Sequence, residues 1–244
     1  MSTSSLRATG AALRGTPLGA APILCAATGL HLAATAVLLP PGPAWIVSGA
    51  AFFSIAATAY HLMPIGERRR PFGLANAVTL LRAGMIAVLL GIAAVPSSTG
   101  AWAVAGLAAA ALALDAVDGP IARKTRRASA FGARFDMEID GLFALTAALL
   151  LWRTGRLDAW ILLIGLPRYA FLLAGRLHAP LRRPLPPRQR RRMLCAIQGV
   201  ALATALAPIV PPGGATLVAA LALLLICGSF ALDIRWLLRR NHTV

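Results

Sequence analysis

Negatively charged residues are scarce in this chain. Only 8 of its 244 residues are Asp or Glu, against 24 Lys or Arg, and charged residues of both signs make up 13% of the sequence. Hydrophobic residues make up 58%. So little charge and so much apolar surface argue against a soluble globular protein, and they predict a chain that crosses a membrane several times.

Cysteine is scarce as well. Cys25, Cys195 and Cys227 stand singly in apolar segments, without a CxxC pair or a histidine nearby. This pattern predicts neither a disulfide nor a zinc site, and we expect the three cysteines to be small core residues.

Eight apolar segments contain most of the hydrophobic residues, and each is long enough, at about 20 residues, to cross a bilayer as a helix. Their expected ranges are 18–39, 44–63, 74–95, 101–121, 129–152, 159–177, 193–209 and 216–236. We therefore predict an all-α fold, a polytopic membrane helix bundle of eight helices. The first two helices form an added transmembrane hairpin.

Most of the basic residues lie between the apolar segments, and they accumulate on one side of the predicted bundle. The clusters on that side are 68–70, 123–127, 182–192 and 239–240. The positive-inside rule places this side in the cytoplasm, where arginines also contact anionic lipid headgroups. The net charge of +16 is explained in this way. We expect membrane lipids as partners and no nucleic acid.

Five of the eight acidic residues lie in one stretch, residues 115–140. Asp115 and Asp118 are three residues apart at the end of one apolar segment, so they share a helix face. Asp136 and Asp140 are four residues apart at the start of the next segment and share a face too. A turn between the two segments would bring all four carboxylates to the same side of the membrane and point them at one another.

Four carboxylates in surroundings of low dielectric stay ionised together only if cations lie among them. Because no His or Cys accompanies them, the oxygen ligands favour a hard divalent ion, Mg²⁺ or Mn²⁺, over zinc or copper. Two such ions about 4 Å apart suit an in-line displacement at phosphorus. The alternative is a divalent-cation transporter or channel, although a position at helix ends, beside a basic loop, favours the enzyme.

The same stretch resembles the signature of the CDP-alcohol phosphotransferase family: Asp, two residues, Asp-Gly, two residues, Ala-Arg, a spacer, Gly, three residues, Asp, three residues, Asp. Its fixed positions are here Asp115, Asp118, Gly119, Ala122, Arg123, Gly132, Asp136 and Asp140. Asn76, Thr79 and Arg82 resemble the Asn-x-x-Thr-x-x-Arg pattern that opens the family's first core helix. The resemblance implies a six-helix catalytic domain over residues 66–244, preceded by the hairpin of residues 1–65.

The resemblance also implies a reaction. A CDP-linked lipid, usually CDP-diacylglycerol, donates its phosphatidyl group to a small alcohol acceptor and releases CMP, as in phospholipid synthesis. We expect a homodimer in a bacterial inner (cytoplasmic) membrane, with the active site facing the cytoplasm.

A role for each signature residue follows from the resemblance. Asp115, Asp118 and Asp136 would bind the divalent ions. Asp140, which also lies near the ions, would take the proton of the acceptor hydroxyl as general base. The small residues would let the cytidine nucleotide lie against bare backbone. The residues expected to bind the nucleotide are Asn76, Thr79, Asp118, Gly119, Ala122, Arg123 and Gly132.

Arg168 and Arg176 resemble arginines on the family's fourth core helix. A charge as deep in an apolar segment as Arg168 is costly and usually functional. With Arg176 it would bind a phosphate on the acceptor, as in glycerol 3-phosphate or an inositol phosphate. A structural pairing of Arg168 with Asp233, or with a helix carbonyl, is the alternative.

Overall fold

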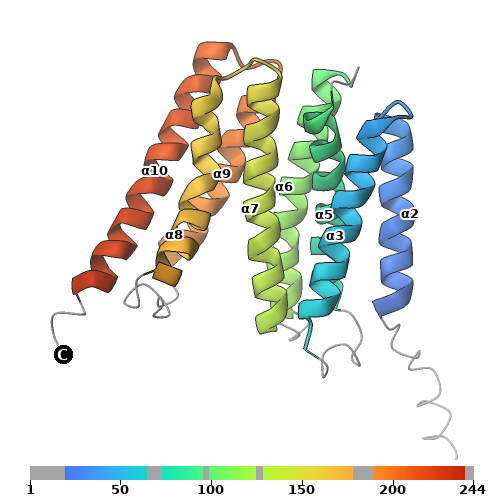
Figure 1. Cartoon of the computed structure of the whole chain (residues 1–244), viewed down its shortest axis with the longest axis horizontal. Coiled ribbons are helices and arrows are strands. Elements are labelled where there is room, and N and C mark those ends of the chain that lie inside the picture. The colour runs from blue at the N-terminus through green and yellow to red at the C-terminus, as the bar shows by residue number, and fades with distance from the viewer. Residues whose placement is uncertain (1–19, 65–72, 96–98, 125–128, 178–188, 240–244) are drawn as a thin grey trace, which may run out of the picture.

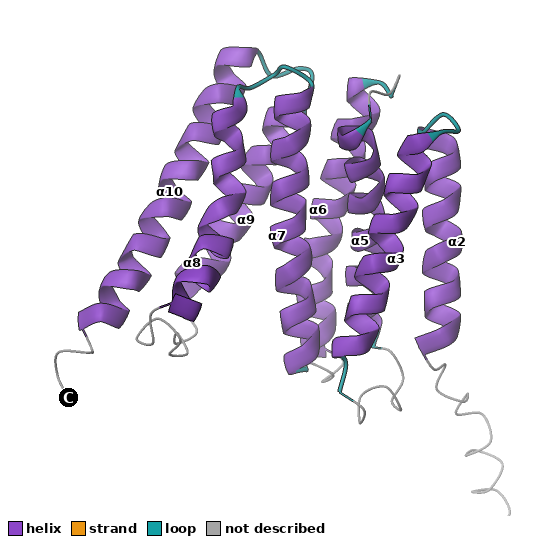
Figure 2. Ribbon diagram, viewed as in Figure 1, coloured by secondary structure: helices purple, strands orange, loops and turns teal. Residues whose placement is uncertain are grey.

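The structure is a computed structural model that describes residues 20–64, 73–95, 99–124, 129–177 and 189–239. Within these ranges the side chains of residues 117–124, of Arg168 and of a few other residues are not described. The described residues form helices and connecting loops without a strand, and the helices lie side by side in one bundle (Figures 1 and 2). The predicted all-α class is confirmed.

The helices follow the predicted segments closely in most places. They are α2 (Ala20–Leu38), α3 (Pro43–Leu62), α5 (Leu74–Ala94), α6 (Ala101–Lys124), α7 (Ala130–Arg153), η1 (Ala159–Gly165), α8 (Leu166–Leu177), α9 (Gln189–Leu206) and α10 (Pro212–Arg239). The described part of the chain thus has nine helical elements where the sequence predicts eight.

The predicted segment 159–177 accounts for the difference, because it is two helices and not one. A 3₁₀-helix, η1, is followed directly by the α-helix α8. Pro167 lies at this junction, and proline is tolerated in the first turn of a helix but not in its interior. A side chain on Gly165 would overlap Leu145 of α7, so η1 also lies unusually close to its neighbour.

Two helices begin earlier than the sequence predicts. α9 begins at Gln189 and not near Met193, because arginine is a good helix former and extends the helix beyond its apolar part. α10 begins at Pro212 and not near Thr216, since proline suits the first helical turn.

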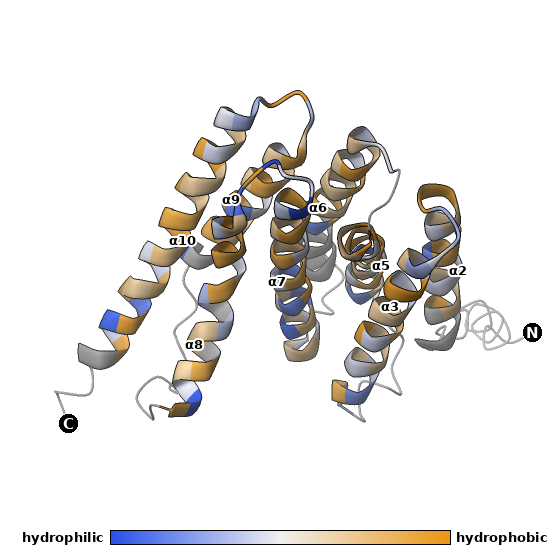
Figure 3. Ribbon diagram, turned by 45° about the horizontal axis from the view of Figure 1, so that its top comes forward, coloured by the Kyte–Doolittle hydropathy of each residue, from blue (hydrophilic) through white to orange (hydrophobic). Residues whose placement is uncertain are grey.

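Several helices have the length and hydropathy of membrane spans. Among the described residues α3, α5 and most of α10 are long and apolar enough to cross a membrane, and η1 with α8 makes a fourth span if the pair is taken together. Shorter apolar stretches lie in α2, α6 and α9. Hydrophobic residues run along these helices, whereas α7 has hydrophilic bands (Figure 3). The protein is a membrane helix bundle, and the number of eight crossings stays a prediction.

Helix α5 is the centre of the half of the bundle that contains the acidic residues. It packs against α2, α3, α6 and α7. In its apolar window 61% of the residues are buried, against 17% in α3 and 28% in α10. A polar side chain on α5 is therefore held in place by helices on several sides.

The N-terminal hairpin packs tightly on α5. A Cβ atom on Gly91 would lie 2.7 Å from the carbonyl oxygen of Ala44 in α3. His31 of α2 is buried, with Nδ1 3.2 Å from the carbonyl oxygen of Gly84 and its ring stacked on Phe52, the centroids 4.5 Å apart. The predicted boundary between residues 65 and 66 lies outside the described residues, and the hairpin packs closely on the first helix of the predicted catalytic domain.

The cysteines differ from expectation. Cys25, Cys195 and Cys227 are free, but all three are exposed on the surface of the bundle and not in its core. The expectation that they are core residues is wrong, because lipid is as apolar as a protein core and accepts the same small side chain.

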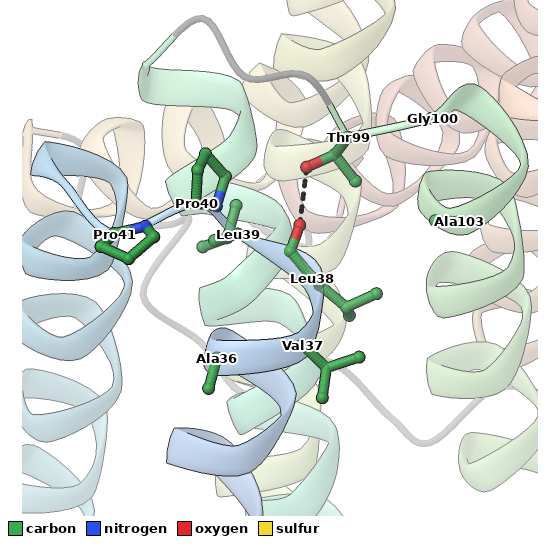
Figure 4. Close-up of a pocket in the computed structure, with 9 residues that line it drawn as sticks. All are labelled: Ala36, Val37, Leu38, Leu39, Pro40, Pro41, Thr99, Gly100 and Ala103. Atoms are coloured by element: carbon green, nitrogen blue, oxygen red, sulfur yellow. Dashed lines mark hydrogen bonds between the residues drawn. The ribbon is translucent and has the colours of Figure 1, made fainter.

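An open pocket of about 480 Å³ lies beside the turn between α2 and α3. Its lining residues are Ala36, Val37, Leu38, Leu39, Pro40, Pro41, Thr99, Gly100 and Ala103 (Figure 4). Thr99 Oγ1 donates a hydrogen bond of 2.8 Å to the Leu38 carbonyl there. The pocket has no titratable side chain, and it lies at the end of the bundle away from the acidic residues.

Candidate metal and nucleotide site

Two helices supply the acidic residues, and α5 lies against both. Asp115 is on α6, and Asp136 and Asp140 are one turn apart on α7. The start of α7 is fixed by Ser129, whose Oγ accepts a hydrogen bond of 2.9 Å from the Gly132 N–H. This N-cap supplies an acceptor for one of the first-turn N–H groups that have no partner within the helix, and it sets where α7 begins.

The three described carboxylates converge on the guanidinium of Arg82, which comes from α5. Arg82 Nη1 lies 2.8 Å from Asp115 Oδ1 and 2.7 Å from Asp136 Oδ1. Arg82 Nη2 lies 2.6 Å from Asp140 Oδ1. One planar fork therefore joins the first half of the signature, on α6, to the second half, on α7.

Arg82 approaches the carboxylates from the buried side. Its side chain is 3% exposed, whereas the side chains of Asp115, Asp136 and Asp140 are 25%, 35% and 35% exposed. Its Nε donates to the Ala111 carbonyl of α6 over 3.2 Å, which fixes the plane of the guanidinium. The acidic cluster is consequently closed by Arg82 on the inside and open toward the outside.

The donor set fits a hard divalent ion. Asp115, Asp136 and Asp140 each offer a carboxylate oxygen, and these oxygens all lie within 4.8 Å of one another. Mg²⁺ and Mn²⁺ prefer such oxygen ligands. Asp118, the fourth predicted ligand, follows Asp115 by three residues on α6, but its side chain lies outside the described residues.

Asp115 lies deeper in its helix than the sequence predicts, whereas Asp136 and Asp140 lie about as deep as predicted. Asp115 is followed by nine further residues of α6, which continues to Lys124, and Asp140 is the eleventh residue of α7. The sequence predicts that the first of these helices ends at residue 121, three residues before the end of α6, and that the second begins at residue 129, one residue before α7 begins. The site is therefore within the bundle and not at the tips of α6 and α7.

Two of the predicted nucleotide-binding residues are adjacent. A Cβ atom on Gly132 would lie 2.6 Å from Oδ1 of Asn76, so the glycine is what lets the Asn76 amide approach α7. Thr79 is 3% exposed, and its hydroxyl donates to the Ala75 carbonyl over 3.0 Å. Both Asn76 and Thr79 precede Arg82 on α5, at intervals of three residues.

The remaining predicted residues are described only in part. Gly119, Ala122 and Arg123 belong to the last two turns of α6, where side chains lie outside the described part of the chain. The Arg168 side chain is also outside it. Arg176 is exposed near the end of α8, a helix that packs on η1 and α10.

Asp233, the alternative partner predicted for Arg168, forms an ion pair with Arg190 of α9. It is 2% exposed, and its Oδ1 lies 2.8 Å from Nη2 of Arg190. This ion pair joins α9 to α10. Because the Arg168 side chain lies outside the described residues, its pairing with Asp233 stays a prediction.

Arg82 is the site residue whose role the sequence does not reveal. The signal for it is the polar stripe of Asn76, Thr79 and Arg82 on one face of an otherwise apolar segment. A charge in such a segment has to face protein or a water-filled cavity. What the stripe does not reveal is that Arg82 faces the carboxylates.

Comparison with known proteins identifies the family. Residues 72–228, more than half of the chain, match the CDP-alcohol phosphatidyltransferase family. No curated protein and no solved structure matches the chain. The matched region includes α5 to α9 and most of α10, and with them Arg82, Asp115, Asp136 and Asp140. The chain belongs to the CDP-alcohol phosphatidyltransferase family.

Proposed function

We propose that this membrane transferase moves a phosphatidyl group from CDP-diacylglycerol to an alcohol and releases CMP, as a step of phospholipid synthesis. Family membership supports the reaction class. The observation that carries the assignment to a site is the convergence of Asp115, Asp136 and Asp140, which lie on two helices and offer oxygens within 4.8 Å of one another.

In the proposed site Asp115, Asp118 and Asp136 hold two Mg²⁺ or Mn²⁺ ions. When bound, such ions neutralise charge on the donor's diphosphate and on the leaving phosphate. Asp140 takes the proton of the acceptor hydroxyl as that oxygen forms its bond to the phosphorus next to the lipid. The phosphorus–oxygen bond to CMP breaks, and CMP leaves with the electron pair.

The nucleotide is proposed to lie along the start of α7 and the end of α6. The contact between Asn76 and Gly132 supports this, because it puts an amide next to a helix position without a side chain. Gly119 and Ala122 would extend the bare surface on α6. Asp118, Arg123 and Thr79 would border the same pocket.

The acceptor is proposed to carry a phosphate that Arg168 and Arg176 bind. Arg168→Ala should then raise KM for a phosphorylated acceptor by about tenfold or more, since a charge-assisted hydrogen bond is lost, and leave KM for the donor unchanged. Equal effects on both substrates, or none on the acceptor, would return Arg168 to a structural role.

The proposed setting is a homodimer in a bacterial inner membrane with the acidic site on the cytoplasmic side. The arginine clusters between the helices support this orientation. The domain division is proposed as residues 1–65 for the hairpin and 66–244 for the catalytic domain.

Release of CMP tests the proposal. Purified protein in detergent, with CDP-diacylglycerol and Mg²⁺ or Mn²⁺, is offered a panel of alcohols that includes glycerol 3-phosphate and an inositol phosphate. We expect CMP to form with one class of alcohol and to stop when EDTA is added. CMP formation that continues at the same rate in EDTA would contradict the metal site. The absence of CMP formation with every alcohol would contradict the reaction.

The depth of the carboxylates within α6 and α7 favours one other function, the transport of divalent cations. Liposomes that contain the protein and a Mn²⁺-sensitive dye separate the two functions. A transferase forms CMP without Mn²⁺ uptake, whereas a transporter takes up Mn²⁺ in the absence of any nucleotide.

A further inference from the structure

Arg82 does more than line the acidic site, because its guanidinium lies where the carboxylates meet. Its two Nη atoms contact three carboxylates at 2.6 to 2.8 Å, and its Nε bonds the Ala111 carbonyl. Every nitrogen of the fork is thus engaged, by atoms of two different helices. A side chain that is 3% exposed and bound in this way has little freedom to leave.

The charges explain what this arrangement achieves. Asp115, Asp136 and Asp140 are partly buried and close together, so without a cation they repel one another and are poorly solvated. The single positive charge of Arg82 offsets one of their three negative charges. Among these four described side chains two negative charges remain, and the half-open carboxylates keep an attraction for a divalent ion.

We infer that Arg82 is an internal counter-cation of the acidic site: it holds the three carboxylates together in the absence of divalent ions and lowers the affinity with which the site binds them. This inference rests on the proposed function, since it takes the carboxylates to be metal ligands. Arg82 is a positioning residue, because it acts through the aspartates.

Removal of the charge tests the inference directly. Arg82→Gln should lower the thermal unfolding midpoint of the detergent-solubilised protein in EDTA, because breaking a buried ion pair is strongly destabilising. The same variant should bind Mn²⁺ at least about tenfold more tightly, since a positive charge within a few ångströms of the ion has gone. Mn²⁺ should therefore raise its unfolding midpoint by more than it raises that of the wild type. Electron paramagnetic resonance of free Mn²⁺ gives the affinity.

Arg156→Gln is the matched control. Arg156 is also partly buried, and it donates to the Ala205, Ala207 and Val210 carbonyls at 3.0, 3.0 and 2.8 Å, far from the carboxylates. This variant should unfold earlier than the wild type but bind Mn²⁺ as the wild type does. Loss of any buried arginine is thereby separated from loss of the counter-cation.

A second variant covers the case in which Arg82→Gln does not fold, even when it is purified in Mn²⁺. Arg82→Lys keeps the charge but loses the fork that reaches three carboxylates. Its unfolding midpoint in EDTA should fall, because one ammonium group cannot bridge three carboxylates, whereas its Mn²⁺ affinity should stay near that of the wild type, because the charge is kept. An unchanged midpoint in EDTA for Arg82→Lys would overturn the inference, and so would Mn²⁺ binding by this variant that is about tenfold tighter although the charge is kept. Weaker or unchanged Mn²⁺ binding by Arg82→Gln would overturn it as well.

The test of Arg82 and the test of the proposed reaction can fail separately. If the wild type binds Mn²⁺ but forms no CMP, the proposed function fails and the counter-cation is still tested by the two arginine variants. If CMP forms and Arg82→Gln behaves like Arg156→Gln, the proposed function stands and the counter-cation is refuted.

Discussion

The contact between Gly132 and Asn76 depends on the absence of a side chain at position 132. A Cβ atom on Gly132 would come within 2.6 Å of the Asn76 amide oxygen. The atom in the way is the end of a side chain and not backbone, so Asn76 can turn aside without a change in the fold. A larger residue at position 132 should therefore affect binding more than stability.

Gly132→Ala should leave the thermal unfolding midpoint near that of the wild type and raise KM for the CDP-linked donor by about tenfold, the effect of one displaced hydrogen bond. Steady-state CMP release at saturating acceptor measures this. Gly106→Ala is the control, because a Cβ atom at Gly106 meets nothing within 4 Å. An unchanged donor KM in Gly132→Ala would remove Asn76 and Gly132 from the nucleotide pocket.

The residues of the signature could be predicted from the sequence, whereas the role of Arg82 could not. Spacings of three and four residues put Asp115, Asp136 and Asp140 on helix faces that can meet. Which atom lies between those faces depends on how α5 is rotated against α6 and α7. That rotation is decided by packing along the whole of α5, and no local spacing encodes it.

At the scale of elements, α5 joins the N-terminal hairpin to the site. One side of α5 carries Gly84 and Gly91, where α2 and α3 approach its backbone. Arg82, on the same helix, reaches the carboxylates of α6 and α7. Looser packing of the hairpin should therefore shift α5 and, with it, the position of Arg82 in the acidic site.

Gly91→Ala tests the contact between α3 and α5 on which this connection depends. The added Cβ atom would lie 2.7 Å from the Ala44 carbonyl oxygen, which is backbone and cannot turn aside. We expect a loss of about 1–3 kcal/mol of stability from overpacking, seen as a lower unfolding midpoint. Gly106→Ala, in open space, should match or exceed the wild type. Equal midpoints for the two variants would show that the hairpin contact contributes nothing to stability.

The order and type of the helices followed from apolar length, but their breaks and starts did not. Segment 159–177 is continuous in hydropathy, and only the close contact of Gly165 with Leu145, together with Pro167, divides it. α9 begins inside a basic stretch because helix propensity, and not apolarity, decides its first turn.

In the whole molecule, we expect the acidic site and the turn between α7 and η1 to face opposite sides of the membrane. α7 begins near the acidic residues at Ala130 and ends at Arg153. The arginine clusters predict that the side of Ala130 is cytoplasmic.

Cysteine labelling tests the orientation. In a variant whose cysteines Cys25, Cys195 and Cys227 are replaced by alanine, Thr154→Cys should react with a membrane-impermeant maleimide in intact cells. Ala130→Cys should react only after the cells are made permeable. The reverse pattern would place the acidic site outside the cell.

We propose that the aspartates on α6 and α7 form a metal-dependent transferase site in which Asp140 accepts the proton of the acceptor. The most direct test of this proposal is a pair of measurements on Asp140→Asn: the rate of CMP release, and Mn²⁺ binding by electron paramagnetic resonance. We predict that CMP release falls by at least about 100-fold, the usual contribution of a general base, while Mn²⁺ still binds. CMP release at the wild-type rate would contradict the account.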